Sequence, residues 1–213
     1  MSVRSIILTA LLAAAEARFG QENPPAIQEV AAINGGSPGE AATIAGGLIS
    51  DLLAAANPCK KLQDGDNIIA KLGNGADAVK AAQDFVHAEQ NFNPFNSPIP
   101  SLCSDPTLPA TAELRGILPL IDPGVIGSDV ANKVADASLT TPLDATGKSI
   151  ADLFLEQGFS NFTTKDAAGT AGIPSGSAGF HDRGCPSAGM GFWLIGERRW
   201  LSVFEISRFE GAM

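Results

Sequence analysis

The chain has 213 residues, of which 45% are hydrophobic and 17% charged, and its formal net charge is −9 at pH 7. This length suits one domain of ordinary size with a real core. The acidic excess argues against nucleic acid and anionic membranes as partners, because both are bound by clustered lysines and arginines. No apolar run after residue 17 reaches the roughly 18 residues of a spanning helix, so we expect no transmembrane segment.

The first 17 residues predict export. A basic residue near the start is followed by an apolar run over residues 5–15 and by a small-x-small site at residues 15–17. This order is typical of a secretory signal peptide and predicts cleavage between Ala17 and Arg18, which makes the mature protein extracellular. The alternative is that the same residues form an ordinary N-terminal core helix.

The cysteines fit an oxidising compartment. Cys59 and Cys103 lie in loop-like sequence, and the simplest pairing joins them in a disulfide. Cys185 is then left over. An odd cysteine in an exported protein suggests an intermolecular bond, a free thiol or an altered C-terminus.

Helix signals begin at Ser37-Pro38-Gly39-Glu40, where an N-cap serine and a capping-box glutamate surround a proline at the first helical position. That helix should end before Pro58. A second helix is expected within residues 61–72. Apolar residues at helical spacing predict a third helix over residues 76–91, with His87 facing away from its buried stripe.

Prolines recur from residue 92 to residue 123 and exclude a long regular element there. We call this segment the belt and expect it to be an ordered loop that is held by Cys103 and wraps the helices. A short helical turn is expected within residues 111–117 and a helix within residues 128–137. Ser149-Ile150-Ala151-Asp152 is a second capping box, which opens a helix that runs to Gly158. Strand signals are scarce, so the predicted fold is an all-α bundle wrapped by the belt.

The composition divides the chain into four parts. After the signal peptide at residues 1–17 comes a helical domain at 18–165, and a Gly/Ala/Ser-rich stretch at 166–189 is typical of a flexible linker. The tail at 190–213 holds both tryptophans and many arginines. Three interpretations of this tail stay open: an amphipathic segment for a membrane surface or a partner, a late core element, and an error in the gene model such as a read-through intron.

Several motifs resemble cofactor or metal sites but lack the context that such sites need. Residues 73–78 match the G-x-G-x-x-A dinucleotide fingerprint, yet no alternating β/α units follow. His87-Ala88-Glu89 resembles the H-x-E of zinc deaminases, but the second cysteine of P-C-x-x-C is missing. His181, Asp182 and Cys185 are too few for a zinc site. We therefore expect no cofactor and no metal.

No catalytic residues emerge from the sequence. A serine nucleophile needs a base, only His87 and His181 are present, and neither Ser175 nor Ser177 lies in G-x-S-x-G. An Asp/Glu pair stays open, because separation in space decides its role. The body before the tail has no tyrosine or tryptophan, which disfavours a sugar-processing cleft or a lectin site.

Asn161-Phe162-Thr163 is an N-glycosylation sequon that follows Gly158 in an expected loop. It suits an exported chain and predicts a glycan on Asn161. The alternative is a chance match, because such triplets are common.

The body resembles small secreted proteins of filamentous fungi that have no assigned activity. The resemblance covers residues 17–165 and rests on four segments: ARFGQENPPAIQEV, NPCKKLQDGDNIIAKLGNGADAV, QNFNPFNSPIPSLCSDPTLPATAELRGILPLIDP and ATGKSIADLFLEQGFSNFTT. It implies export, the pairing of Cys59 with Cys103, and the glycan site.

These observations predict a non-enzymatic extracellular protein that acts at the cell wall or surface or toward a host, with the belt supplying the binding surface. Two alternatives remain. One is a secreted hydrolase that uses an Asp/Glu pair, and the other is a carrier that holds a small apolar ligand in the helical core.

Overall fold

A computed structural model describes residues 24–90 and 99–174 of the chain. The predicted signal peptide with its cleavage site at Ala17 and Arg18 lies outside these residues. The same holds for His181, Cys185 and the tail at 190–213.

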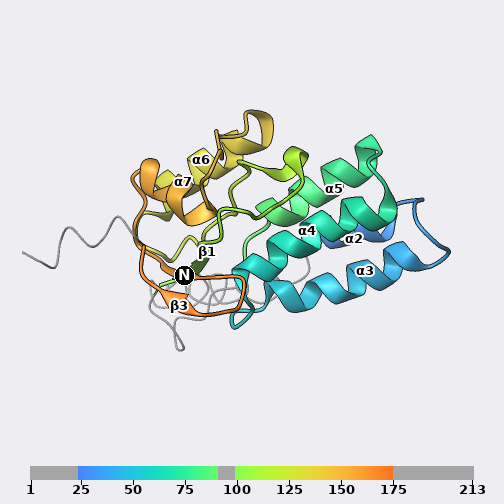
Figure 1. The fold of residues 1–213 in the computed structure, drawn as a ribbon, viewed down its shortest axis with the longest axis horizontal. Helices are drawn as coiled ribbons and strands as arrows, with labels where there is room; N and C mark the ends of the chain where they lie inside the picture. Colours follow the sequence, from blue (N-terminus) through green and yellow to red (C-terminus); the bar gives the residue numbers. More distant parts are fainter. Residues whose placement is uncertain (1–23, 91–98, 175–213) are drawn as a thin grey trace, which may run out of the picture. The chain divides into compact units, whose positions relative to one another are not determined.

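About half of the described residues belong to helices (Figure 1). The α-helices are α2 (Pro25–Ala31), α3 (Glu40–Leu48), α4 (Pro58–Leu72), α5 (Ala76–His87), α6 (Ser128–Thr140) and α7 (Ile150–Glu156). Two short 3₁₀ helices are η1 (Ile49–Leu52) and η2 (Ala112–Leu114). Helices α2 to α5 pack side by side, while α6 lies against α5 and α7 against the first strand.

Local signals explain where helices α4 and α7 start. The side chain of Asn57 accepts a hydrogen bond of 3.0 Å from the backbone N–H of Cys59, and Pro58 occupies the first helical position of α4. Helix α7 has the predicted capping box, in which Ser149 and Asp152 bond each other's backbone N–H groups. The start of α7 is therefore confirmed.

Helix α3 begins three residues later than Ser37, at Glu40. The backbone N–H of Ser37 does donate to the Glu40 carboxylate at 2.7 Å, which is one half of the expected capping box. The other half does not form, because Gly39 adopts a left-handed conformation with φ of 80° and places a turn before the helix.

The prediction of an all-α fold is wrong, because the structure contains a mixed sheet of three strands in the order β1-β2-β3. Strand β1 (Ser101–Cys103) pairs in parallel with β2 (Thr163–Lys165), and β2 pairs in an antiparallel manner with β3 (Ala171–Gly172). Strands of three, three and two residues are too short for an alternating pattern to show in the sequence. One strand also lies in the proline-rich belt.

The stretch that we expected to be a linker starts with ordered structure. A turn at Asp166 leads into β3, since the Thr170 N–H donates to the Asp166 carboxylate at 2.8 Å. The Asn57 amide donates to the Asp166 carbonyl at 2.9 Å, so this turn is tied to the start of α4. Residues 175–189 of that stretch lie outside the described residues.

The described part of the belt turns its large apolar side chains inward. Leu114, Ile117 and Leu118 are fully buried together with Phe85 of α5 and Phe154 of α7. Belt and helices thus share one core cluster.

Side chains outside the apolar core also fasten the belt. The Asp66 carboxylate of α4 accepts hydrogen bonds of 2.8 Å from the backbone N–H groups of Ala110 and Thr111. Backbone groups in an irregular segment need partners when they leave water. The Asp66 carboxylate supplies these partners for Ala110 and Thr111, which lie outside the helices and strands of the belt.

Candidate functional site

Two consecutive lysines at the start of α4 have different surroundings. Lys60 is half exposed, forms an ion pair with Asp64 one helical turn away, and has its Nζ 4.0 Å from Oδ1 of Asp51. Lys61 points into the interior and is 2% exposed. Successive residues of a helix point about 100° apart, which allows this division.

The buried lysine has unusual electrostatics. Its ammonium donates a hydrogen bond to the backbone carbonyl of Ala88. Burial lowers the pKa of Lys61 from 10.5 to about 7, and the charges of Glu89 and Asp51 act in the opposite direction. The sequence did not indicate this residue, because NPCKK resembles an exposed loop.

Asp51 of η1 and Asp64 of α4 form an acid pair. From the sequence, an Asp/Glu pair was an open alternative for which no residues were named. Burial raises the pKa of Asp51 from 3.8 to about 7, and a hydrogen bond and the charge of Asp64 act in the same direction. Asp51 is 5% exposed, and its Oδ2 has no hydrogen-bond partner among the described residues. The Asp51 carboxyl therefore keeps its proton up to about neutral pH while it lies next to a second carboxyl group, and such neighbouring acids are used in general acid–base chemistry.

The acid pair borders an open hollow of about 280 Å³ between α3, η1 and α4. Besides the acids and Lys60, its lining includes Thr43, Ser50 and Asn67. These polar groups supply hydrogen-bond donors and acceptors next to Asp64. Lys60 already neutralises Asp64, so the hollow presents a paired rather than a free carboxylate.

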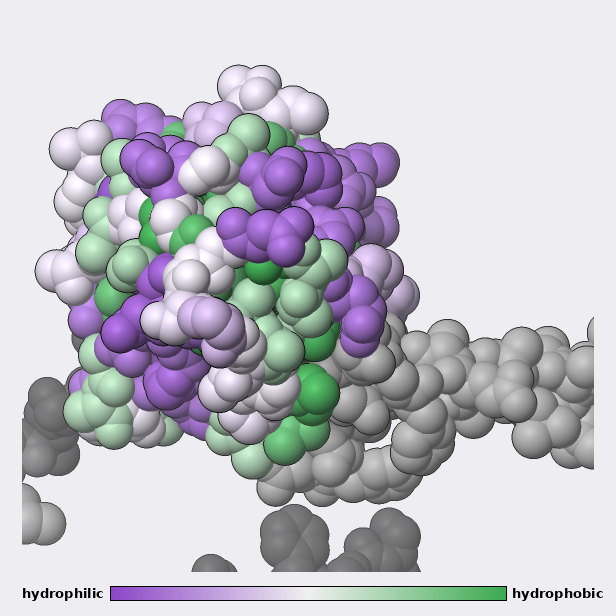
Figure 2. All heavy atoms as spheres, turned by 90° about the vertical axis from the view of Figure 1, so that its right-hand side faces the viewer, coloured by the Kyte–Doolittle hydropathy of each residue, from purple (hydrophilic) through white to green (hydrophobic). Residues whose placement is uncertain are grey.

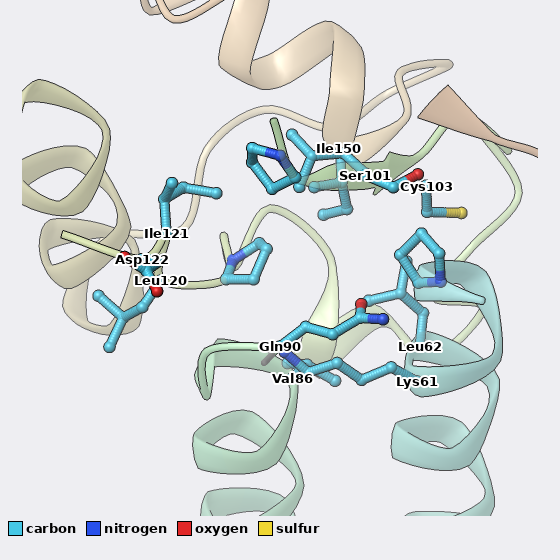
Figure 3. A pocket seen from close by; sticks show the side chains of 14 residues that line it. Lys61, Leu62, Val86, Gln90, Ser101, Cys103, Leu120, Ile121, Asp122 and Ile150 are labelled. Atoms are coloured by element: carbon cyan, nitrogen blue, oxygen red, sulfur yellow. The ribbon is translucent and has the colours of Figure 1, made fainter. Parts of the chain in front are cut away.

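A second pocket lies beside Lys61, between α4, the end of α5 and the belt (Figure 3). Gln90, Cys103, Leu120 and Ile150 line it with Lys61. Its volume of about 30 Å³ has room for one or two water molecules. In this conformation the Lys61 amine therefore has space for water but not for an organic substrate.

His87 lies inside the fold, contrary to the expectation that it faces away from the core. Its Nδ1 is 2.8 Å from the Leu118 carbonyl and its Nε2 is 3.4 Å from the Asp136 carboxylate. The belt and α6 cover the end of α5, and the sequence of α5 alone does not report that contact. His87 links three segments through both ring nitrogens.

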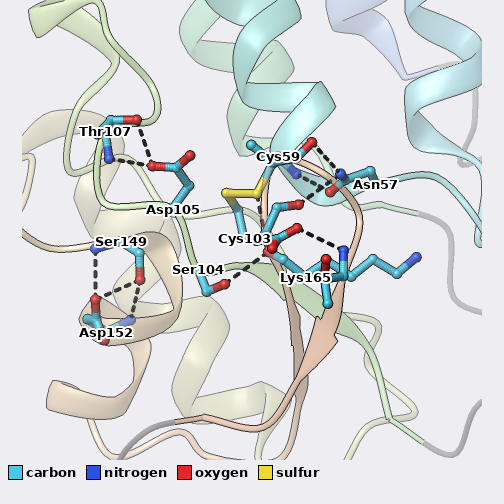
Figure 4. Close-up of a disulfide and its surroundings, with 12 residues drawn as sticks. Asn57, Cys59, Cys103, Ser104, Asp105, Thr107, Ser149, Asp152 and Lys165 are labelled. Atoms are coloured by element: carbon cyan, nitrogen blue, oxygen red, sulfur yellow. Dashed lines mark hydrogen bonds between the residues drawn. A yellow bond between two sulfur atoms is a disulfide. The ribbon is translucent and has the colours of Figure 1, made fainter.

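Cys59 and Cys103, the two cysteines expected to pair, form a disulfide between the start of α4 and β1 (Figure 4). Both are essentially buried. The Lys165 carbonyl of β2 accepts hydrogen bonds from the backbone N–H and the hydroxyl of Ser104, at 2.9 and 3.1 Å. The disulfide therefore lies where the helices meet the sheet.

The sequon begins in the loop after α7 and ends at Thr163, the first residue of β2. Asn161 is half-buried and its Nδ2 donates to the Ile126 carbonyl at 3.2 Å, while Phe162 is in the core. The Thr163 hydroxyl donates to the Pro100 carbonyl at 3.2 Å. Burial alternates along these residues, so Asn161 and Thr163 lie on the side away from the core.

The glycine motif at residues 73–78 joins two helices instead of following a strand, because residues 58–72 are α4. Gly73 ends α4 with φ of 96°, and Gly75 precedes α5. An open groove of about 500 Å³ borders this turn, and its lining includes Glu29, Asp77 and Lys80. On the face formed by this turn and the α2–α3 loop, hydrophilic and hydrophobic residues are interspersed (Figure 2).

Within residues 24–90 and 99–174, no three His, Cys, Asp or Glu side chains come together as a metal site would require. In the same residues, no helix combines the length and the apolar character needed to span a bilayer. No family model, curated protein or solved structure matches the chain.

Proposed function

We propose that this chain is an exported extracellular protein that binds a component of the cell wall, the cell surface or a host surface, and that it acts by binding and not by catalysis. The observation that carries the proposal is the buried Cys59–Cys103 disulfide at the junction of helices and sheet. Structural disulfides persist in oxidising compartments, which is the environment that the signal-peptide pattern at residues 1–17 predicts.

The surroundings of the reactive side chains support binding over catalysis. Lys61 donates to Ala88, His87 contacts Leu118 and Asp136, and the pocket at Lys61 accommodates only water. A catalytic group needs a site where a reacting atom fits within hydrogen-bond distance. The contacts of these two residues instead join segments of the fold.

A binding surface on the belt stays a prediction. Leu102, Leu114, Ile117 and Leu118 of the belt pack into the core, and its residues 92–98 lie outside the described residues. Large apolar side chains are exposed elsewhere in the described residues. They are Ile49, Leu53, Ile126, Val130 and Ile173. Exposed apolar groups of this kind mark candidate contact surfaces.

Export is tested by producing the full chain in a eukaryotic secretory host and analysing the medium by non-reducing peptide mapping. The proposal expects an N-terminus at Arg18 and a peptide that links Cys59 to Cys103. A chain that is retained in the cells with Met1 and free thiols contradicts it.

Binding is tested with the secreted protein and three surfaces: isolated fungal walls, purified wall polysaccharides, and plant or animal cells. Saturable binding that heat-denatured protein lacks supports the proposal. Secreted, folded protein that binds none of the three surfaces contradicts it.

The acid pair favours one second candidate, a secreted hydrolase in which Asp51 donates a proton and Asp64 is the base. The motivation is their contact beside a hollow and the raised pKa of Asp51. The test compares wild type, Asp51→Asn and Asp64→Asn for release of soluble products from wall polymers, with Asp77→Asn as the exposed-carboxylate control. If the chain is a hydrolase, wild type and Asp77→Asn release soluble products, and Asp51→Asn and Asp64→Asn do not. A wild type that releases no product removes this candidate.

A further inference from the structure

Ile126 is the most exposed of the large hydrophobic residues in the described part of the chain. Its side chain is 85% exposed, and Val130, in the first turn of α6, is 48% exposed. The exposed side chain of Ile126 is called the Ile126 surface below. An isoleucine exposed to this degree leaves apolar area in water that burial would remove.

The backbone keeps Ile126 out of the core. The preceding Val125 occupies the buried position, at 5% exposed, and the Val125 N–H donates to the Asp122 carbonyl at 2.9 Å. On the other side, Gly127 has φ of 89° and rests on the ring of Phe159. With Val125 and Gly127 held in this way, the turn presents the Ile126 side chain to solvent.

Asn161 is held beside this exposed isoleucine. Its Nδ2 donates to the Ile126 carbonyl at 3.2 Å, although the two residues are 35 positions apart. Phe159 and Phe162 bracket Asn161 in sequence and stack with ring centroids 5.6 Å apart, beneath the turn that carries Ile126. The amide nitrogen of the sequon is thus held at the backbone of Ile126, the residue whose side chain is exposed.

The chemistry of N-glycosylation suits this arrangement. Attachment of a sugar replaces one hydrogen of the asparagine amide nitrogen and leaves one N–H, which is still able to donate to the Ile126 carbonyl. That bond would orient the first N-acetylglucosamine next to Ile126. A pyranose ring presents C–H groups on its faces, and these cover an aliphatic side chain while the hydroxyl groups stay in water.

We propose that a glycan on Asn161 covers the Ile126 surface, with its first sugar packed on the Ile126 side chain. This inference rests on the proposed export, because N-linked glycans are added in the secretory route. It assigns the Ile126 surface to the protein's own glycan, which removes Ile126 from the candidate contact surfaces named above.

The decisive experiment uses the full chain secreted from a eukaryotic host, with isoleucine methyl groups labelled for NMR. Glycopeptide mass spectrometry first measures occupancy of Asn161. One sample is then trimmed to a single N-acetylglucosamine, and nuclear Overhauser effects are recorded between the sugar protons and the isoleucine methyl groups. We expect contacts to the δ1 methyl of Ile126, and their loss in Ile126→Ser, whose backbone carbonyl is unchanged.

A second readout is the fluorescence of a dye that binds exposed apolar surface. Asn161→Gln should raise the dye fluorescence about twofold over that of the protein with a single N-acetylglucosamine. The double variant Asn161→Gln/Ile126→Ser should return the fluorescence to the lower level. The matched control is Asn161→Gln/Leu53→Ser, which removes an exposed leucine at the end of η1. This variant should not return the fluorescence to the lower level.

The outcomes separate this inference from the proposed function. Secreted protein with Asn161 unoccupied, or occupied without contacts to Ile126, overturns the inference and leaves export and binding intact. Failure of the natural N-terminus to direct export overturns the proposed function. The same chain from Arg18 behind a host signal peptide then still tests the packing of the glycan on Ile126.

Discussion

The Lys61 ammonium donates a hydrogen bond to the backbone carbonyl of Ala88, the residue that ends α5. Carbonyl groups at the end of a helix have no partner within the helix, and a cation there interacts favourably with the helix dipole. A lysine of α4 thus caps α5 from inside the fold. The cost is a buried amine whose pKa falls to about 7.

Lys61→Met should flatten the pH dependence of stability above neutral pH. Because the pKa of Lys61 is about 7 in the folded chain and 10.5 in the reference state, the unfolded chain binds more protons between these values, so the free energy of unfolding rises with pH over that window. Urea titrations at pH 7, 8, 9 and 10 measure this slope. A slope equal to that of wild type would mean that Lys61 is not the titrating group, and Lys133→Met controls for loss of an exposed lysine.

Asp51→Asn should remove a component of the free energy of unfolding that falls with pH below neutral, which is opposite in sign to the Lys61 component. The folded chain holds the Asp51 proton up to about pH 7, whereas the reference pKa is 3.8, so this group's stabilising contribution is present below 3.8 and is lost as the pH rises to about 7. The wild-type free energy of unfolding should contain this falling component between pH 4 and 7, and the variant should lack it. Asp77→Asn should leave it in place. An unchanged slope in Asp51→Asn would assign the component elsewhere.

Loss of the disulfide should cost a large part of the stability. The Cys59–Cys103 bond joins residues 44 positions apart, and closing a loop of that length stabilises by about 4 kcal/mol on a chain-entropy argument. The comparison of Cys59→Ala/Cys103→Ala with its parent is best made in a Cys185→Ser background, so that no third thiol exchanges. Denaturant unfolding should show a loss of about 2–4 kcal/mol. A loss well under 1 kcal/mol would show that the noncovalent contacts alone hold α4 against β1.

Arg115→Met should release the belt. The guanidinium donates to the carbonyls of Pro106, Pro109 and Lys148 at 3.1, 3.0 and 3.3 Å and also to that of Ala145. Removing it leaves several partly buried carbonyls without this donor, at a cost of about 2–3 kcal/mol in the free energy of unfolding. Lys133→Met, at an exposed position on α6, should change stability by less than about 0.5 kcal/mol. Equal effects of the two substitutions would contradict the role assigned to Arg115.

Two glycines with similar backbone angles separate strain from crowding. Gly116 and Gly147 have φ of 80° and 68°, but a Cβ at Gly116 would lie 2.1 Å from the Leu143 carbonyl oxygen, whereas one at Gly147 has nothing within 4 Å. Gly147→Ala should therefore cost about 1 kcal/mol from backbone strain alone. Gly116→Ala should cost well over 3 kcal/mol or prevent folding. The melting temperatures of the two variants measure this difference in stability. Similar melting temperatures would contradict the close approach of Leu143.

The elements that could be predicted are those whose signals lie within one or two turns of the chain. The capping box of α7 needs only Ser149 and Asp152, and the buried face of α5 follows from the helical spacing of Ala78, Ala82 and Phe85. Helix α2 was missed because its seven residues carry only a short apolar pattern after Pro25.

The sheet and the candidate site could not be predicted, for one shared reason. Strand β1 pairs with residues in a segment about sixty positions later, and Asn57 bonds Asp166 across 109 positions. The acid pair also depends on η1 being folded against α4. No local pattern reports which distant segment covers a residue.

Neighbouring residue types were enough to predict the longer helices, the capping box of α7, the cysteines available for pairing and the sequon, because each of these is a local pattern. Tertiary structure alone decided which polar groups left water. It buried Lys61 and His87, raised the pKa of Asp51, and set Asn161 beside Ile126. Burial is a property of packed segments, and the free energy of a charge or an apolar side chain depends on whether water reaches it.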